Sequence, residues 1–399
     1  METVTSRERI MRVLNLQETD RVPVILWLFT QAAKASGISL KDWIFDRRKS
    51  EWAWKYSLMY YGGPDMIYGS DVVYPPVFIL LTCGWGVCSR TLIPGVEGYP
   101  ENAQIQTLEE PPLMEPEDYA LIIEKGLDGI DELVVRKCKK KTARVSGRTV
   151  TLPFETAWVE EEFKTWRPTV QEFEKQDIPV VGSVTLLPTD VLAIARSLTG
   201  FATDLYRRPD DVKKACDRMT KDLVDLALKF SRWLDLEDQP QPRIVDIIPE
   251  RSSPIYFGPK FFEWAVLPYM KELGQKLIDL GYSVKWHCDS DWTPGLKFLL
   301  EVGKYLPKGK CYFHFSGETN MTKVKETLGG RVCVAGDVPA SLLKLGTPKE
   351  VKRYCQRLIE TVGSEGGFIL ANGCEIPFDA KPENVKAIVD AAKSSAIRK

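Results

Sequence analysis

Short apolar runs rich in β-branched and aromatic residues alternate along the chain with longer amphipathic stretches of helical period. Most of the short runs end at or close to Gly, Pro, Asp or Ser, and this repeated alternation is typical of a parallel sheet covered by helices. The eight short runs predict strands at 22–28, 66–73, 178–186, 243–249, 283–288, 311–316, 332–336 and 368–371. Eight such strands predict an α/β fold, a (β/α)8 TIM barrel that forms a single domain over residues 1–399.

The amphipathic stretches predict a helix between most of these strands and another at the end of the chain. One start is well marked: Thr347 can cap the helix, Pro348 suits its first turn, and Glu350 completes a capping box. The predicted helices are 41–61, 189–199, 209–234, 259–280, 294–305, 322–328, 348–362 and 382–394.

Residues 74–177 interrupt the alternation and separate the second and third predicted strands by about a hundred residues, far more than an ordinary connection. This stretch mixes proline, tryptophan and charged clusters. We interpret it as an insertion over the barrel mouth. Within it, residues 143–158 place Ser146-Gly147 between two β-rich runs, which predicts a hairpin.

Composition excludes several classes of function. Lys and Arg (54) nearly balance Asp and Glu (55), so no net field attracts nucleic acid or an anionic membrane. The N-terminus has no apolar signal region, and no stretch approaches the roughly 20 apolar residues that span a bilayer. We therefore expect a cytoplasmic protein. Nine cysteines without a repeated spacing favour reduced thiols over a disulfide framework.

Candidate chemistry gathers where predicted strands end, because the loops after the C-terminal ends of barrel strands carry catalysis. His287 and Asp289 stand two positions apart at one strand end, so their side chains share a face. An imidazole and a carboxylate suit Zn2+. A sulfur from Cys374 and an oxygen from Glu250 would complete a tetrahedral set or leave one position for a substrate. A histidine at a strand end can equally be a hydrogen-bonded structural residue.

The chain contains only two histidines, and both stand near the ends of adjacent predicted strands. We interpret His314, which lies among aromatic residues, as a packed imidazole or one that supports a ligand from behind. Cys374 follows the last predicted strand, where Gly373 allows a turn and Pro377 prevents the strand from continuing. A thiolate at this position could bind a metal.

Several motifs together resemble the uroporphyrinogen-decarboxylase superfamily. At the start of the chain they are residues 6–9 (SRER) and 20–24 (DRVPV). The C-terminal motifs are 336–338 (GDV), 346–351 (GTPKEV), 366–370 (GGFIL), 373–377 (GCEIP) and 382–385 (PENV). The resemblance covers most of the chain apart from 74–177, and it implies a TIM barrel.

The superfamily divides into decarboxylases and corrinoid-dependent methyltransferases. The decarboxylases carry an arginine-rich segment after the first strand, whereas residues 28–34 here read LFTQAAK, so the chain resembles the methyltransferase branch. In that branch the thiol-accepting enzymes bind zinc through His-x-Cys and a later Gly-Cys segment. His287 and Cys374 match this pattern, but Asp289 stands in place of the first cysteine. A His-x-Asp version resembles the methyltransferases that demethylate methoxylated aromatic compounds.

The resemblance implies a zinc-dependent enzyme that moves a methyl group from a methoxylated aromatic, or a similar small methylated substrate, to the Co(I) corrinoid of a carrier protein. His287 and Asp289 would be its catalytic residues. Trp85 and Trp166 could wall the aromatic ring or simply pack beneath a long loop. The alternatives are a methyl-cobalamin:thiol or folate methyltransferase, a uroporphyrinogen-type decarboxylase, and a non-catalytic corrinoid- or tetrapyrrole-binding barrel. The chain could also assemble as a homodimer.

Overall fold

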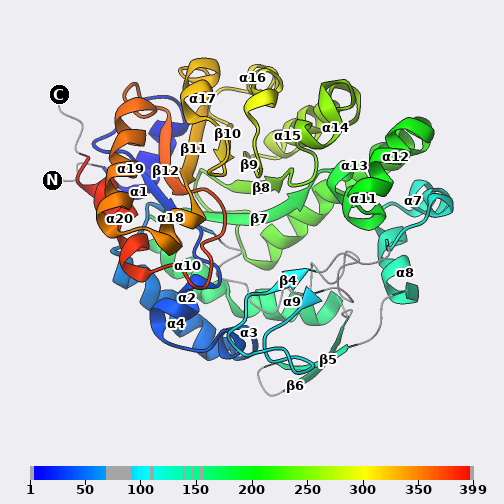
Figure 1. Ribbon diagram of the computed structural model, residues 1–399, viewed down its shortest axis with the longest axis horizontal. Helices are drawn as coiled ribbons and strands as arrows, with labels where there is room; N and C mark the ends of the chain where they lie inside the picture. The colour runs from blue at the N-terminus through cyan, green and yellow to red at the C-terminus, as the bar shows by residue number, and fades with distance from the viewer. Residues whose placement is uncertain are drawn as a thin grey trace.

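The computed structural model describes residues 4–68, 91–107, 112–137, 141–145, 148–152 and 156–395. Eight parallel strands form a closed barrel in the order β1-β12-β11-β10-β9-β8-β7-β2 (Figure 1), which confirms the predicted (β/α)8 fold. The barrel strands are β1 (Val24–Leu26), β2 (Met66–Tyr68), β7 (Val180–Leu186), β8 (Ile244–Ile248), β9 (Ser283–Cys288), β10 (Cys311–Phe315), β11 (Cys333–Val338) and β12 (Phe368–Asn372).

Each predicted strand overlaps one of these barrel strands, but β11 extends two residues and β12 one residue beyond the predicted ends. Residues 69–73 of the second predicted strand lie outside the described part. Every residue of β9, β10, β11 and β12 is buried, as expected of parallel strands covered on both faces. β1 is shorter than predicted because side chains satisfy the backbone at both of its ends. Val24 donates its N–H to Asp65, and Trp27 donates its N–H to the side-chain oxygen of Asn372.

Three predicted helices are divided in the structure. The stretch 41–61 forms α3 (Leu40–Phe45) and α4 (Arg47–Tyr61), with Asp46 capping the second helix. The stretch 189–199 forms α11 (Pro188–Arg196) and the start of α12 (Leu198–Arg207), separated by Ser197 at φ 66°. The stretch 259–280 lies in α14 (Pro254–Phe261), a π-helical turn η3 (Phe262–Val266) and α15 (Leu267–Asp279).

The other predicted helices are confirmed with small shifts at their ends, and the capping box forms between Thr347 and Glu350. They are α13 (Pro209–Trp233), α16 (Leu296–Tyr305) preceded by the 3-10 turn η4 (Thr293–Gly295), α17 (Met321–Leu328), α19 (Pro348–Thr361) and α20 (Pro382–Lys393). Outside residues 74–177, three short helices were not predicted: α1 (Ser6–Leu14), α2 (Gln31–Ser36) and α18 (Ala340–Leu345).

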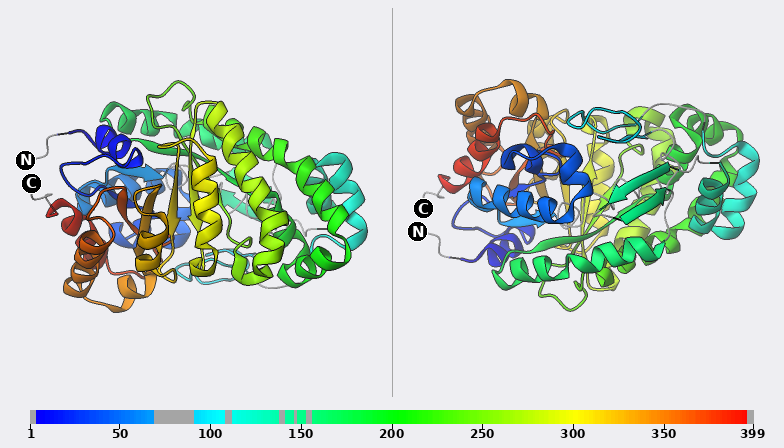
Figure 2. Two further views of the ribbon diagram at one scale, coloured as in Figure 1. Left: turned by 90° about the horizontal axis from the view of Figure 1, so that it is seen from above. Right: turned by 90° about the horizontal axis from the view of Figure 1, so that it is seen from below.

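The region 74–177 contains its own secondary structure. The described elements are the hairpin β3 (Thr91–Leu92) and β4 (Gln106–Thr107), η2 (Pro116–Asp118), α7 (Tyr119–Lys125), α8 (Leu127–Lys137), β5 (Lys141–Val145), β6 (Arg148–Leu152), α9 (Thr156–Thr165) and α10 (Arg167–Lys175). β5 pairs antiparallel with β6, which confirms the predicted hairpin, but residues 156–158 belong to α9 and not to a strand. The chain termini lie at one end of the molecule and α7 and α8 at the other (Figure 2). That this region covers the barrel mouth, and that 1–399 form a single domain, stay predictions.

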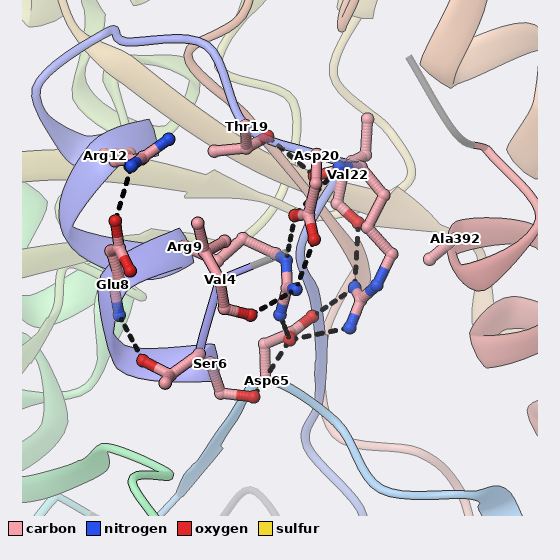
Figure 3. Close-up of polar contacts among 12 residues, drawn as sticks. Val4, Ser6, Glu8, Arg9, Arg12, Thr19, Asp20, Val22, Asp65 and Ala392 are labelled. Atoms are coloured by element: carbon pink, nitrogen blue, oxygen red, sulfur yellow. Dashed lines mark hydrogen bonds and ion pairs between the residues drawn. The ribbon is translucent and has the colours of Figure 1, made fainter. Parts of the chain in front are cut away.

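A buried ionic cluster closes the barrel at the N-terminal ends of β1 and β2 (Figure 3). Asp65 accepts two hydrogen bonds from Arg21, at 2.6 and 2.9 Å, and one from Arg9 at 2.7 Å. Arg9 also donates to both oxygens of Asp20. The motif at residues 20–24 therefore anchors the start of β1, at the barrel end where such groups contribute to stability.

Two predictions that concern the whole chain can be checked only in its described part. Each cysteine in that part is free: Cys216, Cys288, Cys311, Cys333, Cys355 and Cys374. None of the helices in the described ranges is long and apolar enough to cross a membrane.

Candidate metal centre

His287, Asp289 and Cys374 come together where β9 and β12 end. One ligand atom from each lies within 4.8 Å of the others, the distance expected of side chains that share one metal ion. His287 Nε2 is 3.4 Å from one oxygen of Asp289, and the Cys374 thiol donates to the other oxygen at 3.7 Å. Three of the four candidate ligands thus form one cluster of a nitrogen, an oxygen and a sulfur donor.

One ring nitrogen of His287 in this cluster is available to bind a metal ion. His287 is completely buried near the end of β9, and the indole of Trp27 lies edge-on to its ring at a centroid distance of 4.9 Å. Its Nδ1 lies 3.0 Å from Nδ1 of His314, whereas its Nε2 has no hydrogen-bond partner among the described residues. A buried ring nitrogen without a hydrogen-bond partner among the described residues, beside a carboxylate and a thiol, is a donor set that could hold a metal ion such as zinc.

His314 lies directly behind His287. The two residues are paired in register on β10 and β9, and His314 Nε2 lies 2.7 Å from the backbone carbonyl oxygen of Asn372. Burial, together with the nearby charge of Lys285, lowers the pKa of His314 well below its ordinary value. The ring is therefore neutral, and it supports His287 without joining the ligand cluster.

Charge interactions set the protonation of the other two candidates. Burial alone would raise the pKa of Asp289, but His287 and the Cys374 thiol outweigh this effect and lower it. Burial and the Asp289 carboxylate raise the pKa of the Cys374 thiol well above its ordinary value. A metal that binds here would displace the thiol proton, as zinc does in other thiolate sites.

Gly373 sets the approach of Cys374 to the site. A β-carbon at this position would lie 2.7 Å from the backbone nitrogen of Gly317, so only glycine lets the two loops pack this closely. Close packing, and not a turn with positive φ, is therefore the reason for the glycine. The N–H of Gly373 donates to the carbonyl of Val338 at the end of β11, which fixes the start of the Cys374 loop.

Glu250 lies outside the cluster. It follows β8, and its side chain is exposed. Although the residue is exposed to water, the protein atoms around its carboxyl group raise the pKa of Glu250, and the nearby Asp289 carboxylate raises it further. Glu250 therefore lies beside the candidate site, but it does not belong to the group of residues that could bind one metal ion jointly.

A buried ion pair beneath the site was not predicted from the sequence. Lys285 stands two positions before His287 on β9, and its ammonium group lies 2.7 Å from Asp246 on β8. The same ammonium lies over the rings of Trp27 and Tyr68, at 4.6 and 4.4 Å from their centroids. Counting back by two from His287 would have found this lysine, since a lysine inside an otherwise buried strand needs a partner.

Of the two tryptophans proposed to wall a substrate ring, Trp85 lies outside the described residues. Trp166 precedes α10 and is only 2% exposed within the hydrophobic core. Its position agrees with the alternative, packing beneath the surrounding segments.

Comparisons with known proteins agree with this fold. A search of curated proteins finds no match. Among solved structures, a "methyltransferase from Methanosarcina mazei" superposes with a TM-score of 0.65, 18% sequence identity and 98% coverage of both chains, a likeness in fold. Residues 153–395 match the family model described as uroporphyrinogen decarboxylase (URO-D). Since this match spans more than half of the chain, the protein belongs to the URO-D family.

Proposed function

We propose that this URO-D family member is a methyltransferase. In this proposal it moves the methyl group of a methoxylated aromatic, or a similar methylated compound, to the Co(I) corrinoid of a carrier protein. Zinc would be held by His287, Asp289 and Cys374. The observation that carries the proposal is Nε2 of His287, which has no hydrogen-bond partner in the described part of the chain and lies beside one carboxylate and one thiol at the end of a barrel strand.

The segment after β1 favours methyl transfer over decarboxylation. Where the decarboxylases resembled in sequence carry arginines, this chain has Gln31, Ala32 and Ala33, all buried. Gln31 accepts a hydrogen bond of 2.6 Å from the Tyr61 hydroxyl and so belongs to the packing of α2 against α4. This segment offers only the exposed Lys34 as a cation for a polycarboxylate substrate.

The donor set fits zinc and an oxygen-bearing substrate. Three protein ligands leave a fourth position open, as in catalytic zinc sites, and a carboxylate makes the metal harder than a second thiolate would. When bound, zinc would supply a Lewis acid to the ether oxygen, and the corrinoid of the carrier protein would supply the nucleophile for the methyl group.

The residues of the chain have distinct tasks in this scheme. His287 and Asp289 would orient the metal from the rigid end of β9, and Cys374 would give up its proton on metal binding. The buried rings of Trp27 and His314 around His287 exclude water from that side of the site.

The test is to measure zinc in the purified protein and to follow the corrinoid spectrum with Co(I) carrier protein and a panel of aryl methyl ethers. We expect about one zinc per chain and formation of methyl-Co(III) with at least one ether. The proposal is wrong if no ether yields methyl-Co(III) and if methyl-Co(III) that is supplied to the protein is instead consumed when a thiol is added. That result would support a methyl-cobalamin:thiol methyltransferase.

Two variants connect that result to the site. His287→Ala should lose both zinc and methyl transfer. Cys288→Ala changes the buried residue between the two β9 ligands, whose side chain points to the other face of the strand, and should keep both. Full zinc content in His287→Ala would exclude the proposed ligand set.

A further inference from the structure

Asn372, at the end of β12, contacts both the histidine arm of the candidate metal centre, His287 with His314, and its cysteine arm, the loop that carries Cys374. Its backbone carbonyl accepts a hydrogen bond from His314 Nε2, and His314 in turn contacts His287. Its side-chain amide donates to the carbonyl of Cys374 and, at 3.4 Å, to that of Trp27. One buried residue therefore connects the histidine arm and the cysteine arm of the site.

The chemistry of these groups fixes the direction of each hydrogen bond. A carbonyl oxygen can only accept, so Nε2 of His314 carries the hydrogen. Two Nδ1 atoms 3.0 Å apart share one hydrogen, and when both rings are neutral Nδ1 of His314 has the lone pair, so this hydrogen belongs to Nδ1 of His287. In that arrangement the lone pair of His287 is on Nε2, the atom that lies beside Asp289.

We propose that His314 and Asn372 act as one positioning unit for the metal. His314 would fix His287 in the tautomer that presents Nε2, and Asn372 would hold the Cys374 loop at the matching position. This inference rests on the zinc site of the proposed function and deepens it. Neither residue would touch the metal or the substrate.

The two arms can be separated by mutation. His314→Gln can still donate to the Asn372 carbonyl and accept from His287, whereas His314→Leu can do neither. Asn372→Ala keeps the backbone carbonyl for His314 but removes the amide contact with Cys374 and the two side-chain hydrogen bonds with the backbone of Trp27. Tyr312→Phe is the matched control, because Tyr312 lies two positions before His314 on β10 and its hydroxyl has no hydrogen-bond partner among the described residues.

The decisive experiment reads the tautomers directly and needs neither metal nor substrate. The chain has two histidines, so protein labelled with 15N-histidine gives signals from two imidazoles only. In the metal-free protein we expect hydrogen on Nδ1 of His287 and on Nε2 of His314, with a coupling between the two Nδ1 nitrogens across their hydrogen bond. A hydrogen on Nε2 of His287 in the neutral ring would overturn the proposal.

Zinc affinity, measured by competition with a chromophoric chelator, supplies the second readout. Loss of a group that orients a metal ligand weakens binding by about 10- to 100-fold. We expect this loss in His314→Leu and in Asn372→Ala, and near wild-type affinity in His314→Gln and Tyr312→Phe. His314→Leu should also lose the fixed His287 tautomer, whereas Asn372→Ala should keep it.

Equal zinc affinity in folded His314→Leu and wild-type protein would contradict the positioning role. A failure of the proposed function would give a different set of results. If the substrate assignment is wrong, methyl transfer is absent while the tautomers and the variant series behave as described. If zinc does not bind, the tautomers of the metal-free protein still decide whether His314, held by the backbone carbonyl of Asn372, orients His287.

Discussion

The ionic cluster at the N-terminal end of the barrel should make Asp65→Asn strongly destabilising. Asp65 is 1% exposed and accepts hydrogen bonds from Ser6, Arg9, Arg21 and the backbone of Val24. Asparagine keeps the size of the side chain but removes its charge, and its amide nitrogen would face donors. Breaking a buried ion pair from one side costs about 3–5 kcal/mol, since a buried charge is left uncompensated.

The expected shift in melting temperature follows from the length of the chain. An unfolding entropy of about 2.1 cal/mol/K per residue gives roughly 0.8 kcal/mol/K for 399 residues, so Asp65→Asn should melt about 4–6 °C lower. Circular dichroism at 222 nm during heating measures this shift, and zinc content should stay unchanged.

Glu8→Gln is the matched control for the same cluster region. Glu8 and Arg12 form an exposed ion pair one turn apart on α1, with side chains 46% and 41% exposed. Exposed pairs contribute about 0–1 kcal/mol, so the control should melt within roughly 1 °C of the wild type. If the Asp65 and Glu8 variants melt at the same temperature, the buried cluster does not have the stabilising role assigned to it.

Three further variants test particular features of the structure. Glu250→Gln should keep wild-type zinc content by metal analysis, because Glu250 lies outside the ligand cluster; loss of the zinc would make it a ligand. Gly373→Ala should weaken zinc binding in a chelator competition, because its β-carbon would lie 2.7 Å from the backbone nitrogen of Gly317, and unchanged affinity would mean that the loops part freely. Burial raises the pKa of Asp337 to about 7, although Tyr354 donates a hydrogen bond to it. The folded state therefore holds a proton that the unfolded chain releases above pH ~4, and stability falls as pH rises from about 4 to 7. Melting curves across this range should show a smaller fall for Asp337→Asn, and identical pH profiles would contradict the assignment.

The barrel could be predicted because its strands are buried on both faces and end in residues that stop a strand. The divided helices could not, since amphipathic character continues across each break. Asp46 and Ser197 interrupt helices by capping the following one, and Ser197 does so at positive φ. A serine or aspartate in the middle of an amphipathic stretch looks the same in sequence whether it caps a helix or faces solvent.

The candidate site could be predicted in its residue types but only partly in its geometry. The period of two along a strand brings His287 and Asp289 to one face, and barrel closure brings Cys374 to them from β12. Sequence could not exclude Glu250 from the cluster, because the reach of a side chain beyond a strand end depends on the loop path. The role of Asn372 depends on which atoms of its backbone and side chain face His314 and Cys374, and no spacing rule contains that information.

The motifs that resemble the superfamily divide between the two ends of the barrel, and this division decides what each can say about function. Residues 20–24 include Arg21, which binds Asp65 beneath the strands, so their likeness concerns the stability of the fold. Residues 373–377 include Cys374, which lies with His287 and Asp289 above the strands, so the departure at Asp289 concerns chemistry. A variant of Asp65 should therefore change the melting temperature without changing zinc content, and a variant of His287 should lose zinc without a comparable loss of stability. A folded Asp65 variant that lost its zinc would contradict this separation of the two ends.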